Sequence, residues 1–255
     1  MKITLPDNSI KEMKKGSTGL DVALSIGAGL AESAIAVNID GLQKDLGDKI
    51  EQDCSISIIT IDSDEGLEIM RHTIAAQVLA AAIKNLFPNS KLAIGPTIDN
   101  GFYYDVLSDK TISSEDLSAI ETEMQSLIES KSLINKSMHS KKEAVNLFKK
   151  KKEDYKVNII NESEQDKDFQ IYTNNDTQFI DLCVGPHLPN LGFVGPFKLT
   201  KVAGAYWKGD SSNEMLTRIY GTAWRTKKEL EDYLTQIKEA EKRDHRKIGK
   251  DLDLF

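Results

Sequence analysis

The segment from Asp181 to His187, Asp-Leu-Cys-Val-Gly-Pro-His, concentrates side chains that can transfer protons or attack a carbonyl group. A carboxylate, a thiol and an imidazole all lie within seven residues, at a Gly-Pro turn that follows an apolar run. Loops of this kind often carry binding and catalytic residues, so structural and functional interpretations of His187 are equally open. His72 lies in a helical pattern, where a lone histidine is more often packed than catalytic.

Two further segments combine turn residues with aromatic side chains. The first, residues 95–105, contains Gly95 and Pro96 followed by Tyr103 and Tyr104. The second, residues 203–210, contains the run Tyr206-Trp207-Lys208. Aromatic rings can line a pocket or stack on a nucleic-acid base, but they can also be ordinary core residues beside turns.

The composition is that of a soluble globular protein with one or two domains. The chain has 255 residues, of which 40% are apolar and 29% charged, and its net charge is −7. It contains no signal-peptide pattern and no run near the roughly 20 apolar residues of a membrane span. Its two cysteines do not suggest a disulfide scaffold, so we expect thiols in a reducing cytoplasm.

Positive charge is concentrated between Lys136 and Lys156, where eight lysines occur. A solvated helix face is the favoured interpretation of this run, and a phosphate-binding patch is the alternative.

The first 62 residues read as a small β-grasp unit, a sheet wrapped on one helix. Strands are indicated at 2–5, 34–39 and 55–61, with a return strand near 10–14 and a helix capped by Ser17 or Thr18.

The remaining chain reads as a second α+β unit followed by a charged helix. Helical spacing of apolar residues predicts helices over 67–86, 113–131, 141–152 and 226–250, the first capped by Asp64. Strands are expected at 91–94, 101–106, 157–160, 178–183, 197–202 and 216–222. The predicted domains are therefore residues 1–62, 63–224 and 225–255, and the fold class is α+β.

Taken together, these segments resemble bacterial threonyl-tRNA synthetases. The resemblance is carried by His72, by Ala-Ile-Gly-Pro at 93–96, by Asp-Asn-Gly-Phe-Tyr-Tyr-Asp at 99–105, and by the segment 181–187. Residues 198–224 and 243–250 fit the same family, and residues 1–62 resemble its N-terminal ubiquitin-like module. The resemblance implies a β-grasp module, an editing domain and a linker helix that leads to a catalytic domain.

The resemblance also implies a chemistry, which is hydrolysis of serine wrongly attached to threonine tRNA. The catalytic set would consist of His72, Lys156, Asp181, Cys183 and His187. A histidine suits proton transfer from a positioned water, and Lys156 suits the developing oxyanion. A second, hydrolytic site is needed because one missing methyl group changes the binding free energy in the synthesis site by only about 1–3 kcal/mol. The expected substrate-binding residues are Gly95, Pro96, Tyr103, Tyr104, Tyr206, Trp207 and Lys208.

The chain departs from the family pattern at one position. The family places a second histidine four residues after the first, but here that position is Ala76, followed by Gln77. Gln77 could reach the pocket only through a local helical bulge. His72, Cys183 and His187 would then be an incomplete tetrahedral set, so we expect no zinc site.

The expected partner is tRNA(Thr) mischarged with serine, and the full-length enzyme is expected to be a homodimer in the cytoplasm. We expect no cofactor in this region, because ATP, Mg and Zn belong to a catalytic domain whose motifs lie outside these 255 residues. A non-catalytic tRNA-binding or regulatory module is the alternative function, and Ala76 favours it.

Overall fold

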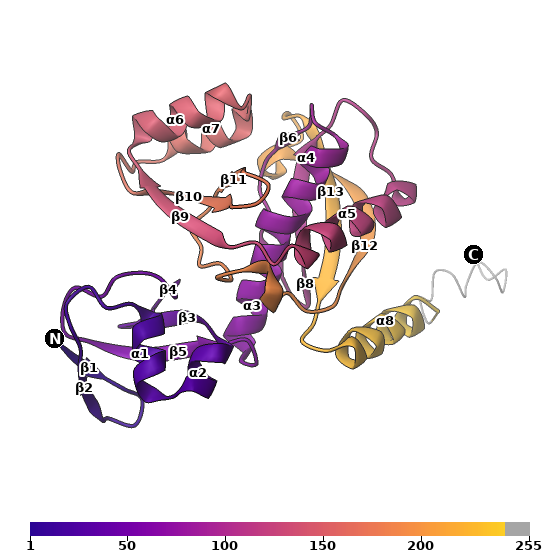
Figure 1. Ribbon diagram of the computed structural model, residues 1–255. Helices are drawn as coiled ribbons and strands as arrows, with labels where there is room; N and C mark the ends of the chain where they lie inside the picture. The colour runs from indigo at the N-terminus through magenta and orange to yellow at the C-terminus, as the bar shows by residue number, and fades with distance from the viewer. Residues whose placement is uncertain (243–255) are drawn as a thin grey trace.

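The N-terminal unit of the computed structural model, which describes residues 1–242, is a sheet with two helices on one side (Figure 1). Its elements are β1 (Lys2–Thr4), β2 (Ile10–Glu12), α1 (Gly19–Ile26), α2 (Ala28–Ser33), β3 (Ala34–Ile39), β4 (Leu42–Asp45) and β5 (Cys54–Thr60). The strand order is β2-β1-β5-β3-β4, with β1 parallel to β5. The β-grasp prediction is confirmed, although β4 was missed because three of its four side chains are exposed.

A long helical segment forms the centre of the second unit. It runs through α3 (Asp64–Thr73), a π-helical segment (Ile74–Leu79) and α4 (Ala80–Leu86) without a break. Ser63, rather than the predicted Asp64, caps its start, because the Ser63 hydroxyl accepts a hydrogen bond from the Gly66 amide at 3.0 Å.

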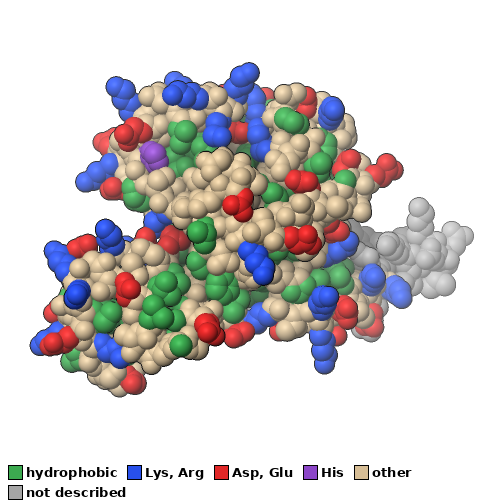
Figure 2. Space-filling view, in the orientation of Figure 1, with side chains coloured by type: hydrophobic (Ala, Val, Ile, Leu, Met, Phe, Trp, Pro, Cys, Tyr) green, Lys and Arg blue, Asp and Glu red, His purple; other side chains and the backbone are tan. Residues whose placement is uncertain are grey.

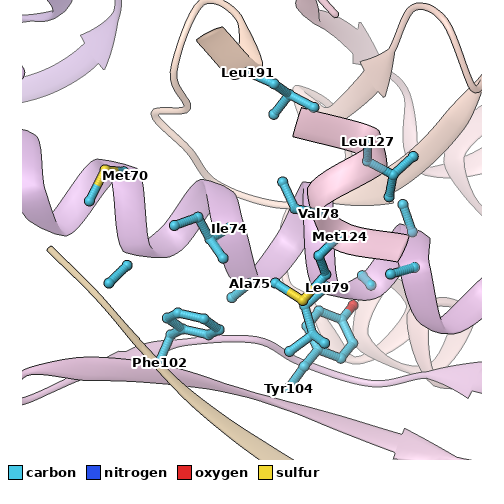
Figure 3. Packing of buried hydrophobic residues seen from close by; sticks show 14 of the residues in the cluster. Met70, Ile74, Ala75, Val78, Leu79, Phe102, Tyr104, Met124, Leu127 and Leu191 are labelled. Carbon is cyan, nitrogen blue, oxygen red and sulfur yellow. The ribbon is translucent and has the colours of Figure 1, made fainter. Parts of the chain in front are cut away.

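This segment packs on a five-stranded sheet of order β12-β13-β8-β6, with β7 paired to β8. The strands are β6 (Lys91–Leu92), β7 (Thr97–Ile98), β8 (Gly101–Leu107), β12 (Phe197–Tyr206) and β13 (Met215–Ala223). Figure 3 shows Met70, Ile74 and Val78 of the helix above Phe102 and Tyr104 of β8. Helix α5 (Leu117–Glu129), which follows a short 3-10 turn (Ser114–Asp116), adds Met124 and Leu127 to this core.

A smaller sheet of order β11-β10-β9 lies beside the central helix. It consists of β9 (Ile134–His139), β10 (Phe169–Asn174) and β11 (Phe179–Leu182), and it packs on α6 (Lys141–Lys150) and α7 (Asp154–Glu162). The predicted strand at 157–160 is wrong, because these residues belong to α7. The buried pair Lys156 and Ile160 has the four-residue spacing of a helix face.

The C-terminal described element is α8 (Lys227–Lys242), part of the helix predicted over 226–250. Residues 243–255 of that prediction lie outside the described range. Tyr233 of α8 packs against Trp224, and Arg71 of α3 lies over the Trp224 ring at 4.8 Å. Short 3-10 turns occur at Leu191–Phe193 and Trp207–Gly209. Within residues 1–242, no helix has both the length and the apolar character needed to cross a membrane.

Candidate functional site

A cavity of about 450 Å³ opens where the central helix, the loop after β6, helix α7 and the β10–β11 hairpin meet. Its walls bring together residues that are far apart in the sequence. They are His72, Ala76, Ile94, Gly95, Pro96, Lys156, Ile159, Ser163, Gln165, Asp168, Phe169, Gln170, Asp181, Leu182, Cys183 and Val184. Four of the five predicted catalytic residues therefore line one cavity, and so do Gly95 and Pro96.

His72 and Cys183 are in direct contact at one wall. The distance from His72 Nε2 to Cys183 Sγ is 2.8 Å, and the Gly185 amide donates to the same sulfur at 3.5 Å. Burial lowers the pKa of His72, although a hydrogen bond with the Gly95 backbone acts in the opposite direction. A neutral imidazole with Nε2 facing the thiol is ready to accept a proton.

Cys183 remains a neutral thiol in this environment. Burial raises its pKa to about 12, and the nearby Asp181 acts in the same direction. Because the thiolate is the nucleophilic form, Cys183 is poorly suited to covalent catalysis. The thiol can instead donate a hydrogen bond to His72 Nε2, which fixes the orientation of the imidazole.

Lys156 and Asp181, which also line the cavity, form a buried ion pair. Lys156 Nζ lies 2.6 Å from Asp181 Oδ1, and both side chains are almost fully buried. Tyr104 donates its hydroxyl to Asp181 Oδ2 at 3.0 Å, and the Leu182 amide donates to Oδ1 at 2.8 Å. Burial raises the pKa of Asp181, while Lys156 and these donors lower it.

This arrangement fixes the position of a buried cation. An ammonium group has three donors, and Asp181 takes one of them. The others are available to a carbonyl oxygen inside the cavity. A positioned donor of this kind stabilises negative charge that develops on oxygen.

His187 lies behind His72 rather than on the cavity wall. The two rings are stacked, with centroids 4.7 Å apart, and the Tyr172 and His187 rings form a T-shaped pair with centroids 4.4 Å apart. The Thr73 hydroxyl donates to the Ile69 carbonyl at 2.8 Å, so it accepts from His187 Nδ1–H at 3.1 Å. His187 Nε2 is therefore an unprotonated acceptor, and it has no partner among residues 1–242.

Ala76 and Gln77 occupy different environments. Ala76 lines the cavity, on the same wall as His72. Gln77 is fully buried, and neither atom of its amide has a hydrogen-bond partner in the described chain. Both lie in the π-helical segment, which accommodates an additional residue in a helical turn. The bulge considered from the sequence is present, but it does not bring Gln77 to the cavity wall.

The remaining predicted substrate-binding residues lie outside the cavity lining. Tyr103 and Tyr104 are neighbours on β8 and therefore point to opposite faces. Tyr104 supports Asp181 from behind, whereas Tyr103 stacks on Arg218. Trp207 packs on Tyr155, Lys208 pairs with Glu162, and Tyr206 is exposed, so these three do not join the site either.

Three supporting residues were missed in the sequence. Thr73 fixes the His187 ring, Tyr172 packs on it, and Asp45 of the N-terminal unit contacts the same loop. Thr73 directly follows His72, so its proximity could have been noticed. Asp45 and Tyr172 reach the site through tertiary contacts that no local pattern indicates.

Three potential metal ligands lie close together in the site. One ligand atom each from His72, Cys183 and His187 falls within 4.8 Å of the others. A structural zinc site needs four ligands, and the side chain of Ala76 provides none. The three residues therefore form an incomplete ligand set for a structural zinc ion.

Comparison with known proteins identifies relatives for the whole chain. Residues 1–60 match the TGS domain family, and residues 170–220 match the family described as the threonyl and alanyl tRNA synthetase second additional domain. Over 253 residues the chain is 48% identical to a threonine–tRNA ligase of Acidithiobacillus ferrooxidans. Over 255 residues it is 50% identical to one of Francisella tularensis. These matches cover 99% and 100% of this chain but only 39% and 40% of the relatives.

Proposed function

Because this chain carries the TGS and second additional domains and corresponds to the N-terminal region of threonyl-tRNA synthetase, we propose that it edits mischarged tRNA. The reaction is hydrolysis of the ester that joins serine to tRNA(Thr). The main support is that the buried Lys156–Asp181 pair and the imidazole of His72 line the same cavity.

Each group has a defined part in the proposed reaction. Water attacks the ester carbonyl carbon and gives a proton to the Cys183 sulfur, as the thiol passes its own proton to His72 Nε2. Lys156 stabilises the oxyanion that forms. The ester C–O bond then breaks, the ribose oxygen leaves with a proton, and serine and free tRNA are released. Cys183 does not form an acyl intermediate, because burial keeps it as a thiol.

Selectivity would come from the shape of the cavity. The site must accept the serine side chain and reject the additional methyl group of threonine. Since a synthesis site gains only about 1–3 kcal/mol from that methyl, a separate hydrolytic site can provide the missing discrimination. The same proposal places the chain in a cytoplasmic, homodimeric ligase whose ATP, Mg and Zn are bound in the catalytic domain.

The test is a deacylation assay with seryl-tRNA(Thr) and threonyl-tRNA(Thr). We expect the serine ester to be cleaved and the threonine ester to be spared. His72→Ala and Lys156→Ala should each lower the rate by about 100-fold or more. His139→Ala and Lys198→Ala are matched controls outside the cavity lining and should retain the rate.

A binding module without hydrolytic activity is the second candidate. Ala76 favours it, because the cavity lacks a side chain at that position that could orient water. Wild-type protein that binds the tRNA and leaves the seryl ester intact would establish binding alone and reject the hydrolase.

A further inference from the structure

The carboxylate of Asp45 connects the N-terminal unit to the second unit. Asp45 is the last residue of β4. Its Oδ1 accepts from the backbone amide of His187 at 2.9 Å, and its Oδ2 accepts from the Tyr172 hydroxyl at 2.7 Å. Lys136 Nζ lies 2.8 Å from the same Oδ2. The Asp45 and Lys136 side chains are only 16% and 17% exposed, so water screens this junction weakly.

Two of these contacts fix the residues that surround the His187 ring. Asp45 holds the His187 backbone directly, and it orients Tyr172, whose ring edge packs on the imidazole. Burial and Asp45 both raise the pKa of Tyr172, so its hydroxyl stays protonated and remains a donor. The His187 ring in turn stacks on His72 with an interplanar angle of 7°.

The loop that carries Cys183 is held at the same point. A Cβ added at Gly185 would lie 1.9 Å from the Tyr172 hydroxyl, so this loop passes in direct contact with the tyrosine. The Gly185 amide also donates to Cys183 Sγ. Movement of Tyr172 would therefore disturb both partners of His72, the stacked ring and the thiol.

We propose that Asp45 is a positioning residue for the hydrolytic site, and that the N-terminal unit thereby holds the imidazoles in their reactive geometry. This inference rests on the proposed function, because the geometry it protects is that of the deacylation site. Asp45 does not line the cavity and acts through His187 and Tyr172. The N-terminal unit is then a structural part of the active site rather than an independent appendage.

The neighbouring Asp48 provides a matched control at the same junction. Asp48 pairs with Lys136 at 2.5 Å, and Asp45 pairs with the same lysine at 2.8 Å. No hydrogen bond joins Asp48 to His187 or Tyr172 in the described chain. Loss of Asp48 therefore weakens the electrostatic contact between the two units without releasing the His187 loop.

The kinetic test compares Asp45→Ala, Asp45→Asn, Asp48→Ala and Tyr172→Phe in deacylation of seryl-tRNA(Thr). Asp45→Ala should lower kcat by about 10- to 100-fold, because small displacements of reacting groups carry large penalties. Its KM should change by less than about threefold, since Asp45 does not line the cavity. Asp45→Asn should recover most of kcat, because its amide oxygen can accept from the His187 amide while its NH2 group donates to the Tyr172 oxygen, whose own proton can go to Gln170 Oε1. Asp48→Ala should behave as wild type.

Coupling between the two contacts is measured by a double-mutant cycle. If Asp45 acts through Tyr172, the combination of Asp45→Ala with Tyr172→Phe should reduce kcat by less than the product of the single effects. A Tyr172→Phe variant that retains wild-type kcat, or fully multiplicative effects in the cycle, would contradict the proposed route.

A measurement without tRNA separates this inference from the proposed function. The imidazole signals of His187 in the NMR spectrum, assigned by comparison with His187→Gln, should shift in Asp45→Ala and remain in place in Asp48→Ala. If the wild type lacks deacylase activity, the proposed function fails while these shifts still test positioning. Unchanged signals in folded Asp45→Ala, together with an unchanged kcat, would overturn the inference. If Asp45→Ala does not fold, Tyr172→Phe takes its place in the comparison with Asp48→Ala, and it should shift the His187 signals and lower kcat.

Discussion

The rings of His72 and His187 lie nearly parallel, 4.7 Å apart, with one facing the cavity and the other buried behind it. Burial lowers the pKa of both imidazoles, and the charge of His72 further lowers the pKa of His187. A proton on either ring would place a charge in a weakly solvated stack. The stack is therefore stable only when both rings are neutral.

Stability should accordingly fall in acid. Both histidines have folded pKa values below the ordinary 6.5, so the unfolded chain binds more protons as the pH falls through 6.5. Above pH 6.5 the contribution of these two histidines to the unfolding free energy should be complete. Below it, each excluded proton should remove up to about 1.4 kcal/mol per pH unit, until the folded pKa is reached.

Urea unfolding at pH 7.5 and pH 5.5 measures this loss. The unfolding free energy of a His187→Gln variant should depend less on pH than that of the wild type. His139→Gln changes a histidine outside the stack and should keep the pH dependence of the wild type. An equal pH dependence in wild type and His187→Gln would show that the buried ring does not control acid stability.

Deacylation should depend on pH through His72. The reaction needs the neutral imidazole, so the rate should be constant above pH 6.5 and decrease below it as His72 becomes protonated. The positive charge of Lys156 contributes to the lowered pKa of His72. In an NMR titration, Lys156→Met should therefore move the His72 transition to higher pH. A His72 transition above 6.5 in the wild type would contradict this assignment.

Zinc should bind weakly to the wild type and tightly to one variant. Ala76 faces the cavity that His72 and Cys183 also line, so Ala76→His would add a fourth ligand to His72, Cys183 and His187. We expect substoichiometric zinc in the purified wild type and about one equivalent in Ala76→His by elemental analysis. Changing Cys183 to Ser in that variant should remove the metal. Stoichiometric zinc in the wild type would show that three protein ligands suffice.

Exposed lysines on the α6–α7 hairpin should contribute to tRNA affinity. Lys149, Lys150, Lys151 and Lys152 are exposed and form no ion pair within residues 1–242, and helix α7 next to them lines the cavity. Figure 2 shows Lys and Arg side chains along the edge where these helices lie. Changing Lys149 and Lys150 to Ala should weaken tRNA binding. It should also make the slope of log K against log salt concentration less steep by about 0.7–0.9 per lost phosphate contact.

The rate at saturating tRNA should not change in that double variant, because neither lysine lines the cavity. Lys14→Ala with Lys44→Ala removes two exposed lysines from the N-terminal unit and serves as the control. If tRNA binding has the same salt dependence in the wild type and in both double variants, a solvated helix face is favoured for residues 149–152.

The sequence predicts which side chains line the cavity better than it predicts the contacts that hold them in place. The family resemblance selected His72, Lys156, Asp181 and Cys183, and all four line the cavity. The β-grasp unit was also predictable, since its strands alternate or form short apolar runs. The face on which each tyrosine of β8 lies was not predictable without knowing which side the helix covers.

The contacts between distant segments could not be predicted. Asp45 lies in a polar strand with no apolar alternation, so nothing local marks it as a partner of His187 and Tyr172. The helix at 154–162 was mistaken for a strand because its buried residues include a lysine, which interrupts the apolar helical pattern. Lys156 tolerates burial there only because Asp181 compensates its charge.

Gln77 should be replaceable without loss of activity. Its amide is buried with neither polar atom hydrogen-bonded in the described chain, and the cavity wall at this turn is formed by Ala76. Gln77→Met has nearly the same shape and removes the unsatisfied amide. It should therefore raise the free energy of unfolding by about 1–3 kcal/mol, the usual cost of burying such a group. The deacylation rate should stay within about twofold of wild type. Gln77→Ala should be less stable than Gln77→Met, because it leaves a cavity, but equally active. If a folded Gln77→Met protein instead lost most of its deacylase activity, the amide must leave the core during the reaction, and the π-helical segment would then be its route to the substrate.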